Sequence, residues 1–304
     1  MKLKTKNLLT LAELTPKEFL GLIDESIKLK KELKGKGNKP VLKNKTLTMI
    51  FQKPSTRTRV SFEAGMYQLG GHAINLSSDD MQLSRGESIE DTAKTLSRYT
   101  NCIMARVYDH ELLEKLSEHS SVPVINGLSD TFHPCQILAD FMTIKEKKKK
   151  LKGLKIAWIG DGNNVCNSMI YGSALSGVNI SIATPKGFEP NKTVVKEAKK
   201  STTVELTTDP FVAVKNADVI VSDTFSSIHN LDKKRLKKFL PKYQVNSKLM
   251  SAAKKDAIFM HCLPAKRGEE VTSDVIDGVQ SVVWDEAENR LHTQKALLVS
   301  LIHA

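Results

Sequence analysis

Apolar residues in this chain recur with two periods, one typical of helices and one typical of strands, and the two kinds of segment alternate. The first helix is predicted from Thr15, because Thr15-Pro16-Lys17-Glu18 combines a capping box with proline at the first helical position. Apolar residues then recur at helical spacing as far as Gly35. The later apolar runs are short and end in polar loops, as buried strands do. Strands that alternate with helices predict parallel sheets covered on both faces.

The predicted elements form two successive series. In the first series the strands are Thr46–Phe51, Ala73–Leu76, Ile103–Val107 and Val122–Ile125, and the later helices are Thr58–Leu69, Ser88–Arg98, Glu111–Glu118 and Pro134–Lys147. In the second series the strands are Lys155–Ile159, Asn179–Ala183, Val204–Leu206, Val219–Ser222, Ile258–His261 and Ser281–Trp284. A last helix is predicted from Asn289 to Ile302.

The lysine-rich segment from Lys145 to Lys150 separates the two series, and 304 residues suffice for two domains with separate cores. We therefore predict an α/β chain of two doubly wound parallel-sheet domains. The first covers residues 1–147 and the second residues 151–288. The C-terminal helix, residues 289–304, carries a long apolar stripe and is expected to pack back on the first domain.

Composition narrows the class of partner. The net charge of +12 would suit nucleic acid, but much of it lies in local lysine runs, and aromatic residues make up only 6% of the chain, without the aromatic and basic interleaving that stacks bases. We expect small anionic substrates and no nucleic acid. No apolar run reaches membrane-spanning length, so no membrane partner is expected.

The four cysteines are widely spaced and form no pair or cluster with the spacing of a metal site. We therefore expect a reduced, cytoplasmic protein without a cysteine metal site.

The most informative segment is Ser55-Thr56-Arg57-Thr58-Arg59, where an apolar run stops and a helical pattern begins. Short hydroxyl residues can cap a helix, and the free N–H groups and the dipole at its N-terminus favour an anion. The planar guanidinium group of arginine can donate paired hydrogen bonds to phosphate oxygens. An ordinary capped helix with two solvated arginines explains this segment alone equally well.

Other unusual polar residues also follow predicted strands, where ligands bind in open α/β sheets. They are Arg106, His133-Pro134-Cys135-Gln136, Asp223 and His261-Cys262-Leu263-Pro264. One histidine or arginine at a strand end is more often structural than catalytic, but several in the expected place favour a site.

The turn Gly160-Asp161-Gly162-Asn163-Asn164-Val165 is similar to the start of a dinucleotide fingerprint, but Val165 stands where the third glycine belongs. A tight turn from strand to helix, with an asparagine facing a ligand, fits better. A nicotinamide-dependent oxidoreductase remains the alternative from a different class, and a basic nucleic-acid-binding protein is a third.

Taken together, six motifs resemble the aspartate/ornithine carbamoyltransferase family, in its order and over nearly the whole chain. They are the Ser55–Arg59 segment, Met81-Gln82-Leu83-Ser84-Arg85-Gly86-Glu87, His133-Pro134-Cys135-Gln136, Asp161-Gly162-Asn163-Asn164, His261-Cys262-Leu263-Pro264 and Ala287-Glu288-Asn289-Arg290-Leu291-His292. The second and fifth motifs resemble the ornithine branch rather than the aspartate branch.

The resemblance implies transfer of a carbamoyl group from carbamoyl phosphate to the δ-amine of L-ornithine, giving L-citrulline and phosphate. Ser55, Thr56, Arg57 and Thr58 would hold the phosphate. Arg106, His133 and the Thr58 hydroxyl would donate to the carbonyl oxygen as it gains charge. The family further assigns Gln136 and the Leu263 carbonyl to the carbamoyl amide and Arg290 to the pocket, with a cis peptide before Pro264.

For the amino acid, the family assigns Asn164 to the carboxylate and Asp223 to the α-ammonium group, with Ser227 and Ile228 nearby. Cys262 would lie beside the δ-amine, whose proton must leave before the nitrogen can attack. A thiolate, a carboxylate or the departing phosphate could accept that proton. A buried packing cysteine is the plain alternative for Cys262.

Gln82 lies in a loop that, in relatives, reaches the carbamoyl phosphate of a neighbouring subunit, so the resemblance implies a homotrimer with shared active sites. A charged surface loop is the alternative for this segment.

The chain departs from the family pattern after Asp223, where Ser227-Ile228-His229 replaces Ser-Met-Gly. This change removes a flexible apolar side chain and a permissive backbone position. Putrescine or an acylated ornithine is therefore kept as an alternative acceptor, although Asn164 and Asp223 suit a free amino acid head.

Overall fold

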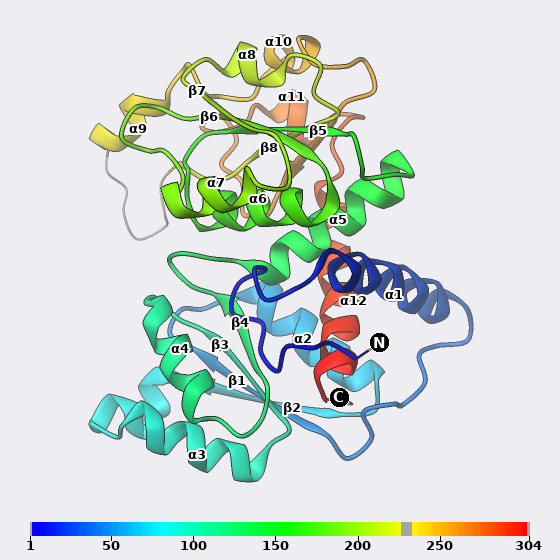
Figure 1. Ribbon diagram of the computed structural model, residues 1–304, viewed down its shortest axis with the longest axis vertical. Helices are drawn as coiled ribbons and strands as arrows, with labels where there is room; N and C mark the ends of the chain where they lie inside the picture. The colour runs from blue at the N-terminus through cyan, green and yellow to red at the C-terminus, as the bar shows by residue number, and fades with distance from the viewer. Residues whose placement is uncertain (1, 226–232, 303–304) are drawn as a thin grey trace. The chain divides into compact units, whose positions relative to one another are not determined.

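The computed structural model describes residues 2–225 and 233–302. Contacts within the chain divide it into two compact units, one made of Met1–Met142 with Glu288–Ala304 and the other of Thr143–Ala287. Each unit contains one parallel sheet with helices beside it (Figure 1). The predicted fold class, two parallel-sheet α/β domains, is thereby confirmed.

The first unit contains a four-stranded sheet in the order β2-β1-β3-β4, with every pair parallel. Its elements are α1 (Pro16–Gly35), β1 (Thr46–Phe51), α2 (Thr56–Gln68), β2 (His72–Ser77), the 3-10 turns η1 (Ser78–Asp80) and η2 (Gln82–Arg85), α3 (Ile89–Tyr99), β3 (Cys102–Arg106), α4 (His110–His119), β4 (Val124–Leu128), α5 (Pro134–Lys148) and α12 (Val283–Ile302). Helices α3 and α4 cover one side of this sheet, and α2 and α12 lie on the other (Figure 1).

The second unit contains a five-stranded parallel sheet in the order β7-β6-β5-β8-β9. Its elements are β5 (Lys155–Ile159), α6 (Asn164–Ser176), β6 (Asn179–Ala183), α7 (Lys192–Ala198), β7 (Val204–Thr207), α8 (Pro210–Val214), β8 (Val219–Ser222), α9 (Lys233–Phe239), α10 (Ser247–Ser251), β9 (Ile258–His261) and α11 (Ser273–Ile276). Helices α6 and α7 lie on one side of the sheet, and α8 and α10 on the other (Figure 1).

The boundary between the units falls inside α5 and α12, so both helices contribute residues to each unit. The domain bounds expected from the sequence, residues 1–147, 151–288 and 289–304, stay a prediction.

The strand predicted over Ser281–Trp284 is wrong. Ser281 forms only an isolated bridge with Phe259, and α12 already begins at Val283, six residues before the predicted helix start. The run of β-branched residues favours a strand by propensity. Here Val282 donates its N–H to the Phe259 carbonyl, and the Glu286 N–H then bonds back to Val282 as the helix starts.

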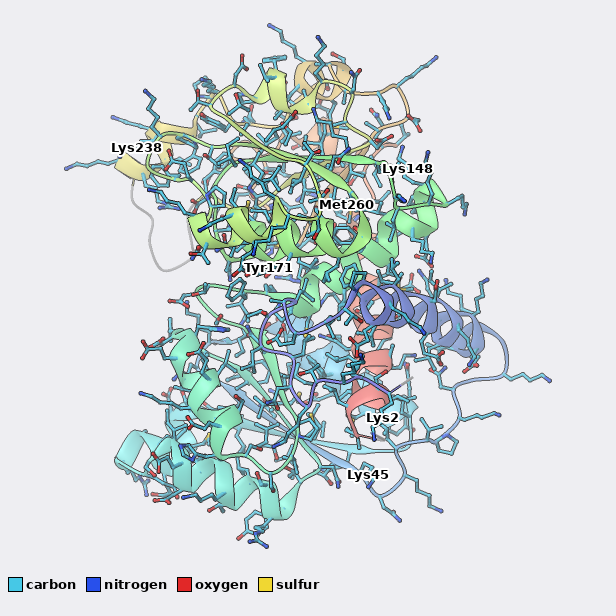
Figure 2. All side chains as sticks on the ribbon, in the orientation of Figure 1. Lys2, Lys45, Lys148, Tyr171, Lys238 and Met260 are labelled. Carbon is cyan, nitrogen blue, oxygen red and sulfur yellow. The ribbon has the colours of Figure 1, made fainter. Side chains whose placement is uncertain are left out.

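The surface carries much of the positive charge. Lys2 in the first unit and Lys238 in the second are exposed, and Lys238 extends outward from the ribbon (Figure 2). None of the helices among residues 2–225 and 233–302 is long and apolar enough to cross a bilayer.

The start of α1 confirms the predicted capping box. Thr15 Oγ1 accepts a hydrogen bond from the Glu18 N–H at 3.3 Å, and Glu18 Oε2 accepts from the Thr15 N–H at 2.9 Å. The Lys4 N–H also donates to Glu18, so the same carboxylate ties the N-terminal segment to the helix. The Thr15 hydroxyl also donates to Glu18 Oε2 at 2.7 Å; this bond first, then those from the Lys4 and Thr15 N–H groups, lowers the pKa of Glu18.

We predict that Thr15→Ala lowers the free energy of unfolding by about 1 kcal/mol, because the first turn of α1 loses its side-chain acceptor. Urea denaturation followed by circular dichroism measures the change. Thr193→Ala on α7, where the threonine is exposed, is the matched control and should stay within about 0.5 kcal/mol. An equal loss in both variants would contradict a specific role for the cap.

Candidate functional site

The strand register of the first unit brings three predicted site segments to one edge of its sheet. Phe51 at the end of β1 pairs with Arg106 at the end of β3, and Arg106 pairs with Leu128 at the end of β4. The pairing skips Gly127, which makes a bulge beside Arg106. A Cβ at Gly127 would lie 2.4 Å from Met104 Sδ, so a larger residue there would displace the Met104 side chain. All of these strands are parallel, but β2 lies on one side of β1 and β3 on the other, so the order of the strands reverses here; this is the switch point where ligands bind in such sheets.

The segment after β1 forms the N-terminus of α2. Ser55 is the N-cap, and its hydroxyl accepts from the Thr58 N–H at 3.4 Å. Thr56 is exposed and Arg57 is half-buried. Arg59 pairs with Glu63 at 3.0 Å on the exposed side of the helix. Of the two arginines in the motif, Arg57 is therefore the one that remains available to an anion at the N-terminus.

The hydroxyl of Thr58 is the point where the predicted site residues meet. It is 1% exposed, and its Oγ1 accepts from Arg106 Nη1 at 3.4 Å and from Arg290 Nη2 at 3.3 Å. Arg290 Nη1 donates to Gln136 Oε1 at 2.7 Å, and Gln136 Nε2 donates to Asp140 Oδ1 at 2.8 Å. Four elements, α2, β3, α5 and α12, thus supply one hydrogen-bonded set.

His133 lies beside this set and directly precedes α5. It is 4% exposed, and burial lowers its pKa well below the usual 6.5, an effect that the positive charges of Arg290, Arg106 and Arg57 increase. Its imidazole is therefore neutral at neutral pH. A neutral ring can donate one hydrogen bond without adding a further charge to an already cationic group.

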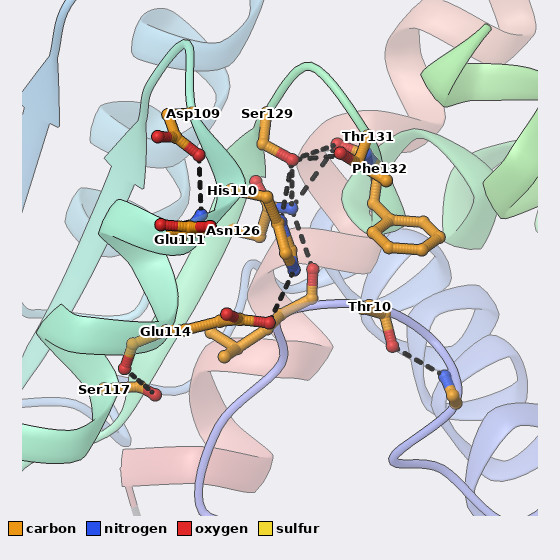
Figure 3. A network of polar contacts seen from close by, with 12 residues as sticks. Thr10, Asp109, His110, Glu111, Glu114, Ser117, Asn126, Ser129, Thr131 and Phe132 are labelled. Atoms are coloured by element: carbon orange, nitrogen blue, oxygen red, sulfur yellow. Dashed lines mark hydrogen bonds and ion pairs between the residues drawn. The ribbon is translucent and has the colours of Figure 1, made fainter.

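A second network orders the loop that leads into His133 (Figure 3). Ser129 Oγ accepts from the Phe132 N–H at 3.2 Å and lies 2.9 Å from His110 Nδ1. Asn126 Nδ2 donates to the Leu9 carbonyl at 2.8 Å, which ties the end of β4 to the N-terminal segment. The edge of the His110 ring also packs against Phe132. The position of His133 is thus fixed from both sides, by this loop and by α5.

Positive charge accumulates at this edge of the sheet. Lys53 follows β1 and lies over the ring of Tyr108. Burial and the positive charge of Arg106 lower the pKa of Lys53, and the negative charge of Asp130 opposes this decrease. Cations held this close repel one another, and a bound dianion would relieve the repulsion. The arrangement therefore fits a small phosphorylated ligand.

The second unit also places predicted site residues at a switch point of its sheet, which lies between β5 and β8. Ile159, Ser222 and His261 are aligned across β5, β8 and β9, so the loops that follow these strands emerge together. Gly160 has φ 133° and Gly162 touches backbone, since a Cβ there would lie 2.3 Å from the Pro190 nitrogen. Both glycines of the turn are thus required by close packing, independently of any dinucleotide.

Asp223 lies at the centre of this second group of residues. It is 8% exposed and accepts three hydrogen bonds: from Asn163 Nδ2 at 2.7 Å, from the Thr224 N–H at 2.7 Å and from Cys262 Sγ at 3.2 Å. All three donors are uncharged groups. The geometry suits capture of an ammonium group.

Asp161 lies next to Asp223 and is tied to Arg235, whose Nη2 donates to its Oδ2. Burial raises the pKa of Asp161 to about 6; Arg235 opposes this change and the Asp223 carboxylate adds to it. Arg235 Nε also donates to the Phe225 carbonyl at 2.8 Å. The arginine therefore braces the turn after β5 against the segment after β8.

The loop that carries Cys262 is held by a buried histidine. His261 Nδ1 accepts from the Leu263 N–H at 2.9 Å, so the ring proton lies on Nε2, 3.3 Å from Glu270 Oε1. The His261 N–H donates to Glu286. Leu263 has φ 57°, and the peptide before Pro264 is cis, as the resemblance predicted.

Asp223, His261 and Cys262 offer ligand atoms within 4.8 Å of one another. Carboxylate, imidazole and thiolate are zinc ligands. Nδ1 of His261 already accepts from the Leu263 N–H, whereas Nε2 lies 3.3 Å from Glu270 Oε1 without hydrogen-bond geometry, so a metal ion at Nδ1 would have to displace the Leu263 contact.

The remaining predicted residues are placed as follows. Gln82 is exposed on η2, outside the buried set around Thr58. Asn164 is half-buried in the first turn of α6, where its Oδ1 accepts from the Val165 N–H at 3.0 Å. Ser227 and Ile228, with the departure at His229, lie outside the described residues.

The structure also adds residues that the sequence reasoning missed. Asp140 follows Gln136 by one helical turn, a spacing that could have indicated the contact. Asn163, to which the sequence analysis assigned no role of its own, donates to Asp223. Arg235 and Glu270 are distant in sequence from the groups they hold, and no local pattern marks them.

Comparison with known proteins agrees with this geometry. The sequence matches the family description "Aspartate/ornithine carbamoyltransferase, carbamoyl-P binding domain" over residues 6–146 and "Aspartate/ornithine carbamoyltransferase, Asp/Orn binding domain" over residues 152–301. A curated relative from Cenarchaeum symbiosum, named ornithine carbamoyltransferase, is 63% identical over 301 residues and covers 99% of each chain.

Solved structures show the same likeness. The ornithine carbamoyltransferase from Pyrococcus furiosus is 51% identical, with a TM-score of 0.95 over 98% of this chain and 97% of that one. The enzyme from Thermus thermophilus is 42% identical, with a TM-score of 0.91 over 98% and 99%. The resemblance found in the sequence is confirmed, and the chain belongs to the aspartate/ornithine carbamoyltransferase family.

Proposed function

We propose that this protein transfers the carbamoyl group of carbamoyl phosphate to the δ-amine of L-ornithine, giving L-citrulline and phosphate. The observation that carries this proposal is the Thr58 hydroxyl, on which Arg106 and Arg290 converge beside a neutral His133. Full-length relatives that are named ornithine carbamoyltransferase support the choice of acceptor.

Carbamoyl phosphate is a dianionic mixed anhydride, and the first unit offers the groups that such a ligand requires. The N-terminus of α2, capped by Ser55, presents backbone N–H groups and the positive end of the helix dipole to the phosphate. Thr56, Arg57 and Thr58 add hydroxyl and guanidinium donors at the same place. Gln136 and the carbonyl of Leu263 hold the carbamoyl amide.

Charge develops on the carbonyl oxygen when the amine nitrogen attacks the carbonyl carbon. Arg106, neutral His133 and the Thr58 hydroxyl donate to that oxygen and stabilise the tetrahedral intermediate. The carbon–nitrogen bond forms, the carbon–oxygen bond to phosphate breaks, and phosphate leaves. Arg290 and Arg57 hold the negative charge of the departing group. Oriented donors supply the catalysis in this scheme, with no cofactor.

The second unit supplies the acceptor site. Asp223 accepts from the α-ammonium group of ornithine, and Asn164 binds its carboxylate. Ser227 and Ile228 are proposed to complete this site. The thiol of Cys262 already donates to Asp223, which places a polarised sulfur next to the carboxylate. Cys262 lies beside the δ-amine, whose proton passes to the thiolate, to a carboxylate or to the leaving phosphate.

We further infer a cytoplasmic homotrimer in which Gln82 of one subunit completes the carbamoyl phosphate site of the next. All four cysteines are free, and burial raises the pKa of the Cys135 thiol to about 12, which suits a reducing compartment. The exposed position of Gln82 on η2 is compatible with a contact across a subunit interface. Membership of the carbamoyltransferase family removes the basis for the oxidoreductase and nucleic-acid alternatives.

The choice of acceptor is tested by comparing ornithine with putrescine, which lacks the amino acid head. We expect rapid formation of citrulline and only weak formation of carbamoylputrescine. Asp223→Asn keeps the shape of the side chain but removes its charge, and should lower kcat/KM for ornithine on the order of a hundredfold with a smaller change for putrescine. Equal or reversed rates for the two acceptors in the unsubstituted protein would defeat the assignment.

The protonation state of His133 is a second test. Since its folded pKa lies well below 6.5, the ring should not titrate between pH 6 and 8. Nitrogen-15 NMR of labelled histidine measures this directly. Arg290→Met should raise the pKa of His133, because one of the charges that disfavour the imidazolium is removed. A titration of His133 near pH 6.5 in the unsubstituted protein would contradict a neutral donor.

Shared active sites are tested by mixing inactive chains. Gln82→Ala and Arg106→Ala are each expected to lower activity at least tenfold, in line with the loss of an oriented donor. Refolding or coexpressing them in equal amounts should restore about a quarter of the sites, since random mixing joins an intact Arg106 to a neighbour's intact Gln82. The control mixture, Arg106→Ala with His133→Ala, should recover nothing. No recovery in either mixture would reject the shared site.

A further inference from the structure

Helix α12 contains a buried polar segment that the sequence pattern did not predict. Between residues 289 and 295, six of seven side chains are polar and at most 3% exposed: Asn289, Arg290, His292, Thr293, Gln294 and Lys295. Buried polar groups require hydrogen-bond partners, and leaving one unsatisfied costs more than the bond contributes. The partners of these side chains therefore explain why the segment is polar.

A row of polar contacts joins this segment to α2. Arg290 donates to Thr58, Gln294 reaches Ser61, and Lys295 Nζ donates to Gln68 Oε1 at 2.8 Å. The two helices come close along this row, since a Cβ at Gly65 would lie 3.2 Å from Lys295 Cγ. Residue numbers in these contacts increase in the same order on both helices, so the two helices run parallel. Their relative position is fixed at several points.

The amide of Gln294 has one orientation that satisfies both of its ends. With the nitrogen toward Ser61, it donates to Ser61 Oγ at 2.5 Å and to the Arg290 carbonyl at 3.0 Å, and the oxygen accepts from Arg290 Nη2 at 3.0 Å. In the opposite orientation the oxygen faces only acceptors and the nitrogen only donors. Gln294 therefore contacts the guanidinium of Arg290 from the next turn of the same helix.

The guanidinium of Arg290 is thus held by acceptors from three helices: Gln136 on α5, Thr58 on α2 and Gln294 on α12. A planar guanidinium contacts its partners in fixed directions, so acceptors on both sides of it set its plane. Arginine otherwise loses considerable rotamer freedom when it is ordered by a ligand. Because Arg290 is already held in place before the ligand binds, this loss of rotamer freedom does not weaken binding.

We propose that Gln294 is a positioning residue of the carbamoyl phosphate site, which acts by fixing the guanidinium of Arg290 in the orientation that binds the donor substrate. The inference rests on the proposed function, since it takes Arg290 to contact carbamoyl phosphate. Gln294 touches no substrate. It determines how well Arg290 is preorganised, and so affects the affinity for the donor rather than for the acceptor.

The test uses Gln294→Met, which keeps the length and helix propensity of the side chain but removes both polar ends. Binding is measured by calorimetry with phosphonoacetamide, a stable analogue of carbamoyl phosphate. We expect its Kd to rise on the order of tenfold, as for the loss of one hydrogen bond to a charged group, and KM for ornithine to stay unchanged. Thr293→Val is the matched control, because Thr293 is equally buried but bonds only to helix carbonyls, and its Kd should not change.

A double-mutant cycle separates positioning from a general loss of stability. The Arg290→Lys variant keeps the positive charge but lacks the planar guanidinium group. In this background, adding Gln294→Met should not weaken phosphonoacetamide binding any further. Should Gln294→Met not fold, Gln294→Asn replaces it: its amide is one methylene shorter, so the contact with Arg290 is lost and Kd should rise likewise. An unchanged Kd, or an equal loss in both backgrounds, would overturn the role of Gln294. No binding to the unsubstituted protein would instead overturn the proposed function, and this inference with it.

Discussion

The concentration of positive charge around one buried hydroxyl group constrains the rest of the first unit. Arg106 and Arg290 both donate to Thr58, and their charges, with that of Arg57, act on His133. Burying cations together is unfavourable unless each is hydrogen-bonded and opposed by charge. The protein meets this requirement in two ways. A series of hydrogen bonds runs from Arg290 through Gln136 to Asp140, and His133 stays neutral. The positive charge that is not balanced in this way attracts an anion.

The second unit has the opposite electrostatic character at the equivalent edge of its sheet. Two neighbouring carboxylates, Asp161 and Asp223, lie after β5 and β8, and Asp161 is paired with Arg235. Asp223 is instead surrounded by the neutral donors of Asn163, Thr224 and Cys262. Neutral donors leave the charge of a carboxylate available to a cation. One unit is thus prepared for an anionic substrate and the other for an ammonium group.

Rigid packing accounts for the precision of both groups. The bulge at Gly127 sets where Arg106 emerges, and the close backbone contact at Gly162 sets where Asn163 begins α6. Behind these residues, fixed contacts hold the groups in place: Ser129 before His133, Glu270 behind His261, and Gln294 beside Arg290. Preorganised donors need little rearrangement when charge develops on a substrate, which is the main source of catalysis in reactions of this type.

The sequence by itself determined the alternation of elements, the capping of α1, the parallel sheets and the loops in which chemistry belongs. These features depend on local periodicity and turn residues, which a single chain displays directly. Its motifs also identified the family. Tertiary structure decided what local patterns could not contain: that α12 begins at Val283, within the predicted strand Ser281–Trp284, and that Asn163 donates to Asp223. It also decided that the polar residues 289–295 are buried. Those outcomes depend on partners more than 20 residues away, such as Phe259 for Val282 and Thr58 for Arg290, whose distance and direction are set only when the sheets and helices pack.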